Sequence, residues 1–294
     1  MTHLLAIANR MYSSWSLRGW LLFDKFGIPI SIRHASMATP AFPAMLEEFS
    51  PARTVPAMRT GNAVVTDSLA IAETLAEAYS DRNMWPDDPV RRGLARSIVA
   101  EIHSGFAPLR SDCAMNLHHR YPTFSPSQPV LEDLTRITLL WDRARQVAAP
   151  GDWLFGAYSI ADAFYAPVAA RIAGHSLPVS GFAAEYVDRH INDLSFRRWR
   201  AMGVAEATAM SRYQLDLPTA PWPGPQPLPA KAAQQATPEN DACPYSGKPV
   251  ATDSIARFGD RTIGFCNTFC RDKSVADPLA WPALAEMLTR EARV

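Results

Sequence analysis

Strand-forming and helix-forming segments are unevenly distributed along this chain, and that distribution limits the folds open to it. Within residues 1–80, Leu4–Ala8 has the pattern of a buried strand, and an apolar helical run follows from Trp15 to Phe26. Over residues 90–215 strand signals are almost absent, and apolar residues recur at helical spacing. The pattern predicts an α/β domain over residues 1–80 and an all-helical domain over residues 90–215, joined by the polar residues 81–89.

The elements of both domains can be placed from local patterns. Ile30–His34 is a second strand, and two short strands follow as a hairpin with Gly61-Asn62 as its turn. Ser68–Tyr79 has one apolar face, and Ser68 can cap that helix. In the second domain we expect helices over Val90–Met115, Gln128–Ala148, Ser159–Ala173, Phe182–Asn192 and Leu194–Ala207.

Composition excludes several classes of protein. The 29 basic and 29 acidic residues give a net charge of zero, whereas a nucleic-acid-binding protein would show a basic stripe. No apolar run approaches the ~20 residues of a membrane span, and the first residues lack the pattern of a signal peptide. Four cysteines are too few for a disulfide scaffold. We therefore expect a cytoplasmic protein with no membrane or nucleic-acid partner.

Beyond residue 215 the composition changes twice. Residues 216–242 are rich in proline, so this stretch should form an extended arm or linker without a core of its own. Residues 243–294 return to ordinary composition and contain three cysteines in a C-x22-C-x3-C pattern: Cys243, Cys266 and Cys270. Three thiolates suit a soft metal such as zinc. No histidine follows His190, so a carboxylate, water or nothing would be the fourth ligand, and free buried cysteines are the alternative.

Two serines stand where the first strand gives way to the first helix. Ser13 and Ser14 precede the apolar helical run, and a helix N-terminus offers unpaired N–H groups with a partial positive charge. A hydroxyl there can donate a hydrogen bond to an anion, including a thiolate. Simple capping of the helix is the alternative.

Two other stretches could bind the remainder of a peptide-like ligand. Val55-Pro56 precedes the hairpin, and a cis bond there would expose backbone groups that can pair with a ligand's backbone. An ordinary trans edge proline is the alternative. Asp67-Ser68 opens the next helix, where the serine and the helix N-terminus could hold a carboxylate and Asp67 could hold an amino group. Capping is again the alternative.

Together these features resemble the glutathione transferases, over residues 1 to about 210. Ser13-Ser14-Trp15-Ser16-Leu17-Arg18 is similar to the Ser-Ser-Cys-Ser-x-Arg motif of the zeta class, which includes maleylacetoacetate isomerases. In this chain Trp15 stands in place of the motif's cysteine. This replacement argues against isomerase activity, but it does not affect the prediction that the site activates a thiol. The resemblance implies a thioredoxin-like first domain, a helical-bundle second domain and a homodimer.

The resemblance also implies roles for individual residues. Ser13 would hydrogen-bond the sulfur of glutathione, with Ser14 and Arg18 as further motif residues. The residues implied to bind the rest of glutathione are Arg53, Val55, Pro56, Asp67 and Ser68. Candidates to line the electrophile's pocket are His103, Phe106, Arg110, Met115 and Asn116. Ser159 and Asp162 match the family's structural capping box.

The implied function is a serine-type glutathione transferase that acts on a small hydrophobic electrophile. A free thiol has a pKa near ~8.5, and one hydroxyl donor plus the helix end would lower it by ~1 to 2 units. A glutathione-dependent isomerase or peroxidase, and a non-enzymatic scaffold, are the alternatives. Residues 243–294 resemble the small metal-binding modules called TRASH or YHS domains, which implies a treble-clef-like fold with zinc held by its cysteines.

Overall fold

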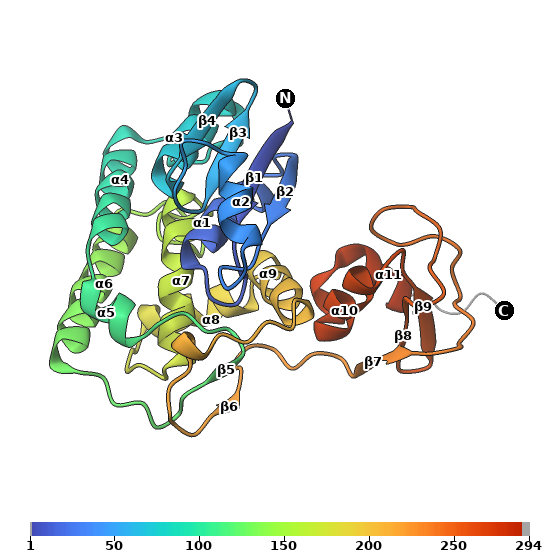
Figure 1. Cartoon of the computed structure of the whole chain (residues 1–294). Helices are drawn as coiled ribbons and strands as arrows, with labels where there is room; N and C mark the ends of the chain where they lie inside the picture. Colours follow the sequence, from blue (N-terminus) through green and yellow to red (C-terminus); the bar gives the residue numbers. More distant parts are fainter. Residues whose placement is uncertain (1, 290–294) are drawn as a thin grey trace. The chain divides into compact units, whose positions relative to one another are not determined.

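The computed structural model describes residues 2–289, and their contacts divide the chain into two compact units (Figure 1). The first unit holds the chain up to Ile191 together with Met210–Pro223. The second holds Asn192–Ala209 together with the chain from Gly224 onwards. Because these units follow contacts and not chain order, the domain boundaries expected from the sequence stay a prediction.

The first unit begins with a four-stranded sheet in the order β2-β1-β3-β4. Its strands are β1 (His3–Ile7), β2 (Ile30–His34), β3 (Ala57–Thr60) and β4 (Ala63–Thr66). β1 pairs in parallel with β2 and antiparallel with β3, and β3 and β4 form the predicted hairpin. Gly61 in its turn has a φ of 54°, a backbone conformation that glycine adopts without steric cost.

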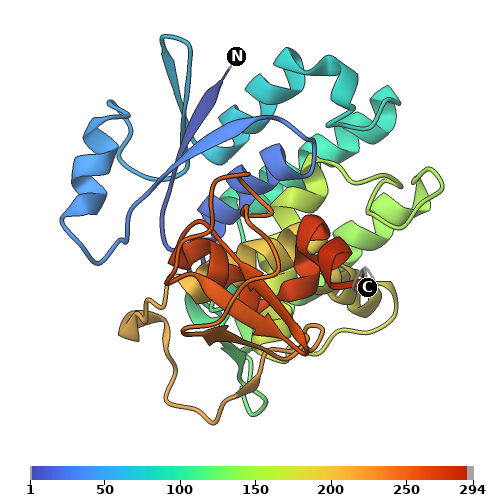
Figure 2. The same cartoon turned by 90° about the vertical axis from the view of Figure 1, so that its right-hand side faces the viewer.

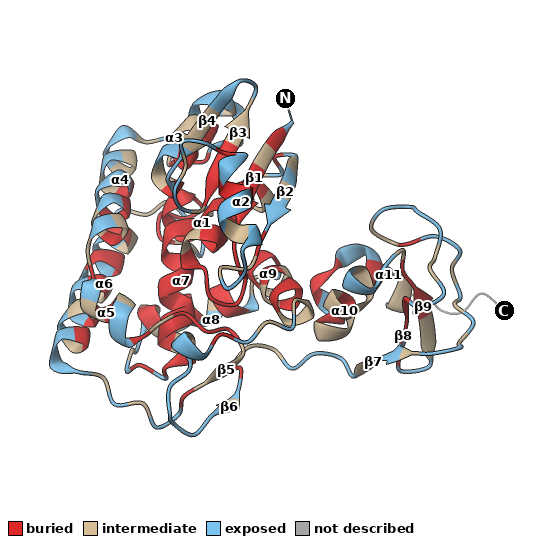
Figure 3. Cartoon of the chain, viewed as in Figure 1, coloured by how far each residue is buried: buried red, intermediate tan, exposed pale blue. Residues whose placement is uncertain are grey.

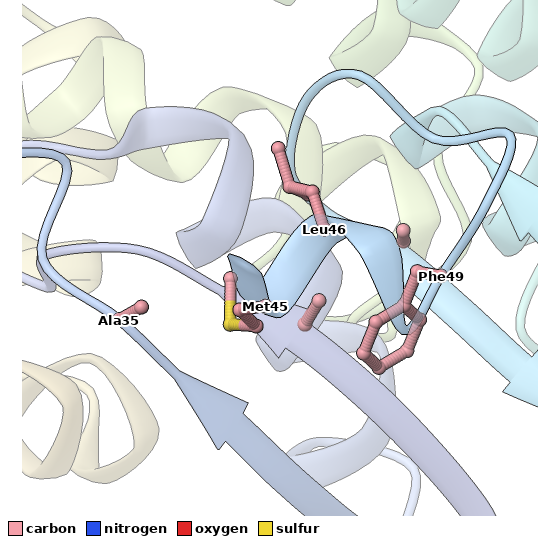
Figure 4. Close-up of a cluster of buried hydrophobic side chains, with 6 residues drawn as sticks. Ala35, Met45, Leu46 and Phe49 are labelled. Carbon is pink, nitrogen blue, oxygen red and sulfur yellow. The ribbon is translucent and has the colours of Figure 1, made fainter. Parts of the chain in front are cut away.

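Three helices accompany this sheet: α1 (Ser14–Asp24), α2 (Ala41–Glu47) and α3 (Ser68–Ala78). α1 packs against α3 and β1. α2 contributes to a buried apolar cluster that includes Ala35, Met45, Leu46 and Phe49 (Figure 4). Ala6 of β1 and Ala57 of β3 belong to the same cluster, so α2 is anchored to the sheet through small strand residues. This arrangement is the predicted thioredoxin-like α/β domain.

Helices form most of the rest of the first unit. They are α4 (Pro89–Ser104), α5 (Ala107–Asp112), α6 (Gln128–Gln146), α7 (Ile160–Gly174) and α8 (Phe182–Asn192), with the 3-10 helix η1 (Ser80–Arg82) before them. α7 is buried along almost its whole length, whereas α4 and α6 keep exposed faces (Figure 3). α7 packs against both α1 and α4, so it is the central helix of this unit.

The predicted single helix over Val90–Met115 is wrong, because it breaks after Ser104. Phe106 has a φ of 62°, a left-handed conformation that interrupts the helix. Pro108 then stands in the first turn of α5, where its missing N–H is tolerated. The guanidinium of Arg110 bonds the carbonyl oxygens of Ile102, His103 and Gly105, which satisfies the end of α4.

The predicted capping box at the start of α7 is confirmed. The Asp162 carboxylate accepts the N–H of Ser159 at 2.8 Å, and the hydroxyl of Ser159 receives the reciprocal bond. Asp162 also accepts the Leu154 N–H at 3.1 Å and the Tyr186 hydroxyl at 2.8 Å. Burial raises the pKa of Asp162 although these donors oppose the shift.

Part of the predicted arm belongs to the first unit. After the 3-10 helix η2 (Ser211–Tyr213), β6 (Ala220–Pro221) pairs with β5 (His119–Arg120). Trp222 is buried beside them, and the Tyr121 hydroxyl accepts the Leu215 N–H at 3.1 Å. Residues 210–223 therefore pack on the helical part of this unit.

The second unit has a three-stranded antiparallel sheet in the order β7-β8-β9 beside its helices (Figure 2, orange and red). Its elements are α9 (Leu194–Ala205), β7 (Ala230–Ala233), β8 (Ile255–Phe258), β9 (Arg261–Gly264), α10 (Thr268–Ala276), the 3-10 helix η3 (Pro278–Ala280) and α11 (Pro282–Thr289). α10 packs against α9, where Arg197 donates two bonds to Asp277 at 2.9 and 2.7 Å. None of the helices within residues 2–289 combines the length and apolar character needed to cross a membrane.

Candidate functional site

A cavity of about 410 Å³ opens at the N-terminus of α1 in the first unit. Six residues that the sequence proposed for the site line it: Ser13, Ser14, Arg53, Val55, Arg110 and Met115. Eight further residues that the sequence did not single out for the site also line it: Tyr12, Trp15, Met37, Phe42, Thr54, Ala114, Arg171 and Tyr213. The cavity thus combines hydroxyl groups, three arginines and an apolar wall.

Ser13 is the N-cap of α1. Its backbone is extended (φ −84°, ψ 93°), and its hydroxyl oxygen accepts the Ser16 N–H at 3.3 Å. The same hydroxyl donates to Ser16 Oγ at 2.8 Å, and Ser16 Oγ also accepts the Ala8 N–H at 3.0 Å. This network joins the end of β1 to the first turn of α1.

Ser14 is the first residue of α1 and has a different partner. Its Oγ accepts a hydrogen bond from Arg171 Nη2 at 3.3 Å, and both residues are buried. Arg171 comes from α7 and also donates to the carbonyl oxygen of Pro167. Burial, followed by the charge of Arg110, lowers the pKa of Arg171 to about 10, so its guanidinium stays protonated at neutral pH.

Arg18, the last residue of the zeta-like motif, does not line the cavity. Its guanidinium lies 4.7 Å from the ring centroid of Trp15 and 5.0 Å from that of Phe164. Burial and the nearby Arg110 and Arg171 hold its pKa well below the usual range. Arg18 therefore supports Trp15, which does line the cavity, through a cation–π contact.

The peptide bond between Val55 and Pro56 is cis, which is one of the two alternatives that the sequence left open. Val55 lines the cavity, and the ring of Pro56 faces Gly19 of α1. A Cβ on Gly19 would lie 2.9 Å from Pro56 Cβ, so glycine lets α1 approach this turn closely. Val55 and the two serines thus line the same cavity.

Asp67 and Ser68 begin α3 and lie outside the cavity lining. Asp67 has a φ of 75°, its Oδ1 accepts the Leu69 N–H at 2.7 Å, and its Oδ2 lies 3.2 Å from His103 Nε2. The hydroxyl of Ser68 is buried and has no hydrogen-bond partner among the described residues. A buried hydroxyl without a partner is costly, so Ser68 is suited to a ligand's polar group.

Three residues proposed for the electrophile pocket lie elsewhere. His103 packs on Trp15 and pairs with Asp67, and burial lowers its pKa although Asp67 opposes the shift. Phe106 forms the break between α4 and α5. Asn116 donates to the carbonyl oxygen of Tyr213 at 3.3 Å, which holds residues after 210 in place.

The wall that these later residues form was missed by the sequence analysis. Tyr213 stacks on Tyr12 with ring centroids 4.9 Å apart, and the Tyr12 hydroxyl accepts the Met210 N–H at 3.2 Å. Burial raises the pKa of Tyr12. No local pattern in the sequence predicts that Tyr213 lines this cavity. Arg171 could have been noticed, because a charged residue within the apolar sequence of α7 is unusual.

The second unit brings the three C-terminal cysteines together. The sulfurs of Cys243, Cys266 and Cys270 all lie within 4.8 Å of one another, and those of Cys266 and Cys270 are 4.0 Å apart. A tetrahedral zinc site with Zn–S bonds of ~2.3 Å would separate sulfurs by about 3.8 Å.

The surroundings of Cys243 also fit a metal-bound thiolate. Burial would raise its pKa, but the N–H groups of Tyr245, Cys266 and Ser246 donate to the sulfur, and the pKa falls to about 7. Cys266 and Cys270 follow the β8–β9 hairpin, with Cys270 inside α10. These three residues could hold a zinc ion, while the TRASH or YHS assignment stays a prediction.

Comparison with known proteins agrees with this fold. Residues 12–78 match the family model described as "Glutathione S-transferase, N-terminal domain". A stretch of 111 residues is 33% identical to a "Probable maleylacetoacetate isomerase" from Caenorhabditis elegans, and covers 36% of this chain. The match spans 52% of that relative, or about half its length.

Solved structures resemble a larger part of the chain. A glutathione transferase homolog from Burkholderia gl BGR1, with bound glutathione, superposes with a TM-score of 0.52 at 23% identity, and covers 69% of this chain and 99% of its own. Glutathione transferase Omega 2S from Trametes versicolor, in complex with 2,4-dihydroxybenzophenone, gives 0.53 at 18% identity, with 70% and 96% covered. Residues 12–78 are therefore similar to the glutathione S-transferase N-terminal domain, and the chain has the glutathione transferase fold.

Proposed function

We propose that this protein is a glutathione-dependent enzyme that activates the glutathione thiol with a serine hydroxyl at the N-terminus of α1. One observation carries the proposal: Ser13, Ser14 and Val55 line one cavity. A strand-like pairing with Val55 would hold the cysteinyl backbone of glutathione, which brings its sulfur to the serines. The helix N-terminus adds a partial positive charge that favours the thiolate.

The two ends of glutathione have their own proposed partners. The buried Ser68 hydroxyl, which lacks a protein partner among the described residues, would donate to the γ-glutamyl carboxylate. The carboxylate of Asp67 would accept the γ-glutamyl amino group. Arg53 lines the cavity and would pair with the glycyl carboxylate. These are the contacts that a tripeptide with three charged groups requires.

The proposed reaction is attack of the thiolate on a small hydrophobic electrophile. A sulfur lone pair forms a C–S bond, and the leaving group departs with the electrons of the bond that breaks. Trp15, Phe42 and Met115 provide an apolar wall for the electrophile. The isomerase relative favours a second candidate, in which the thiolate adds to a double bond, the new single bond rotates, and the thiolate leaves again.

An ultraviolet difference titration tests the proposal. We expect glutathione to give a saturable thiolate band that persists below the pKa of free glutathione. S-methylglutathione is the control, because it has the same ends but no thiol and should bind without the band. Binding of neither ligand to folded protein would contradict the proposal and favour a non-enzymatic scaffold.

A second proposal concerns the second unit, where Cys243, Cys266 and Cys270 would bind one zinc ion. Zinc bound there would stabilise a small unit whose core is limited. We expect one zinc per chain in the wild type and its loss in Cys266→Ser and Cys270→Ser. Cys113→Ala is the control, because that buried cysteine lies in the first unit. Zinc retained in both serine variants would contradict the proposal.

Two expectations on the state of the protein also remain proposals. We propose a homodimer, for which sizing chromatography should give twice the chain mass of 32.4 kDa. A monomeric elution would contradict it. A cytoplasmic location would suit free thiols, since that compartment keeps cysteines reduced.

A further inference from the structure

We infer that Ser14, held by Arg171, donates the hydrogen bond to the glutathione thiolate, and that Ser13 serves as the cap of α1. The inference rests on the proposed function, because it names the donor within the same cavity. It also differs from the assignment implied by the zeta-like motif, in which the first serine of the pair has that role. The two hydroxyls differ in their hydrogen bonds within the protein: the Ser13 hydroxyl both donates and accepts, whereas the Ser14 hydroxyl only accepts.

The single proton of the Ser13 hydroxyl is already committed. A serine hydroxyl has one donor and two acceptor positions. Ser13 donates to Ser16 Oγ at 2.8 Å and accepts from the Ser16 N–H at 3.3 Å. With its proton directed at Ser16 Oγ, Ser13 helps to join the start of α1 to the end of β1.

The proton of the Ser14 hydroxyl is not committed in this way. In the part of the chain that the structure describes, its only hydrogen bond is the one that Oγ accepts from Arg171 Nη2 at 3.3 Å. A hydroxyl whose oxygen accepts from a cation has its own proton left to donate. Because Ser14 lines the cavity, a sulfur bound there is the acceptor within reach.

Arg171 has the properties of a positioning residue. It is buried on the central helix α7, and no carboxylate of the described residues is among the groups that act on its charge. Burial lowers the pKa of Arg171 to about 10, and the positive charge of the nearby Arg110 acts in the same direction. A buried cation without an anion is costly. A thiolate that accepts a hydrogen bond from the Ser14 hydroxyl would supply the missing negative charge near Arg171.

Arg171 would act on the thiolate in two ways. Its donation to Oγ fixes the direction of the Ser14 hydroxyl, and its charge stabilises an anion on the far side of that hydroxyl. Hydrogen bonding to the charged form lowers the pKa of a thiol, and so does a nearby cation. Arg171 and Ser14 should therefore contribute to the same property of bound glutathione.

The test is the pKa of the bound glutathione thiol, measured from the thiolate band across pH in full-length variants. We expect Ser14→Ala to raise that pKa by about one unit or more, and Ser14→Thr to restore most of the shift because it keeps a hydroxyl. Arg171→Met should also raise it, and Arg171→Lys should raise it less. Ser13→Ala should move it by much less, and should chiefly lower the melting temperature.

Control variants and a control ligand separate effects on the thiol pKa from effects on folding and on binding. Ser13→Gly removes the same hydroxyl with a smaller cost to the helix cap, which guards against a Ser13→Ala protein that fails to fold. Ser97→Ala removes a hydroxyl from the exposed face of α4 and should leave the thiol pKa unchanged. S-methylglutathione affinity, measured for each variant, separates loss of binding from loss of activation.

The outcomes distinguish this inference from the proposed function. If Ser13→Gly raises the thiol pKa and Ser14→Ala does not, Ser13 is the donor and the inference is overturned, while the proposed function stands. If Ser14→Ala raises the pKa but Arg171→Met does not, the positioning role of Arg171 is overturned. If the wild type itself gives no thiolate band, the proposed function fails and the inference fails with it.

Discussion

Gly19 of α1 faces the ring of Pro56 so closely that a Cβ on Gly19 would lie 2.9 Å from Pro56 Cβ. The contact sets the distance between the helix that carries the serines and the turn that carries Val55. Gly19→Ala should therefore destabilise the protein by about 1 to 3 kcal/mol through overpacking, as a lower melting temperature would show.

Gly93 provides a matched control for that substitution. It lies in the exposed part of α4, where an added Cβ meets no atom within 4 Å. Gly93→Ala should stabilise the protein by about 0.5 to 1 kcal/mol, because alanine favours a helix over glycine. An equal response at the two positions would show that the contact with Pro56 has no effect.

Ser68→Ala should separate ligand binding from folding. Its hydroxyl is buried without a protein partner among the described residues, so its removal should not lower the stability of the free protein. Loss of a bond to a charged carboxylate should weaken glutathione binding about tenfold or more, as isothermal titration would measure. Ser159→Ala, which removes a bonded cap, should instead lower stability by about 1 kcal/mol. Unchanged glutathione affinity in Ser68→Ala would remove Ser68 from the site.

His190 should make stability fall in mild acid. Burial, together with Lys25 and Arg189, lowers the pKa of this histidine to about 3, below the ~6.5 of an unfolded chain. The unfolded state therefore binds the proton first, and stability is lost as the pH falls below about 6.5. From pH 7 to pH 5 the loss should approach about 2 kcal/mol, as urea unfolding would show.

A substitution at the same position checks the cause. The His190 ring lies between Trp153 and Tyr186, with centroid distances of 5.0 and 4.5 Å. His190→Gln should be less stable at pH 7 but should show a shallower dependence on pH. Part of the slope should persist, because burial also lowers the pKa of His175, to about 4. A slope equal to that of the wild type would rule out His190 as its source.

Arg197 and Asp277 should couple α9 to the end of α10. Their side chains are 15% and 7% exposed, and two hydrogen bonds join them. Arg197→Met should destabilise the second unit by about 3 kcal/mol, because it leaves a buried carboxylate without this partner. Hydrogen exchange in α10 would report the loss. The double variant Arg197→Met with Asp277→Leu should regain stability, and additive losses would contradict the coupling.

Local chemistry made much of the first unit predictable. The hairpin, the start of α3 and the capping box at Ser159 depend on residues a few positions apart, so periodicity and turn composition locate them. The break at Phe106 was missed because a bulky residue with positive φ has no signature in composition. Its conformation is supported by Arg110, whose bonds to the preceding carbonyl oxygens appear only in the folded chain.

The serines and Val55 of the candidate site were predictable because they belong to short motifs. Ser13, Ser14 and Val55 were found in this way, and they line the cavity. The bond between Arg171 and Ser14 joins residues 157 positions apart, and the stacking of Tyr213 on Tyr12 likewise joins distant parts of the chain. Such contacts depend on how α7 and the residues after 210 pack, which no local pattern encodes.

The chain passes between its two units at residues 191, 209 and 223, so each unit is built from segments that are not continuous in sequence. A protease that cuts the exposed stretch around Gln226 would produce an N-terminal fragment that contains α9 and a C-terminal fragment that contains α10. The two fragments would stay bound to each other, because α10 packs against α9 and Asp277 pairs with Arg197. The two fragments should therefore copurify and separate only in denaturant, as in split-protein complementation. By the same reasoning, a truncated chain that stops at residue 223 would deprive α9 of the helix against which it packs.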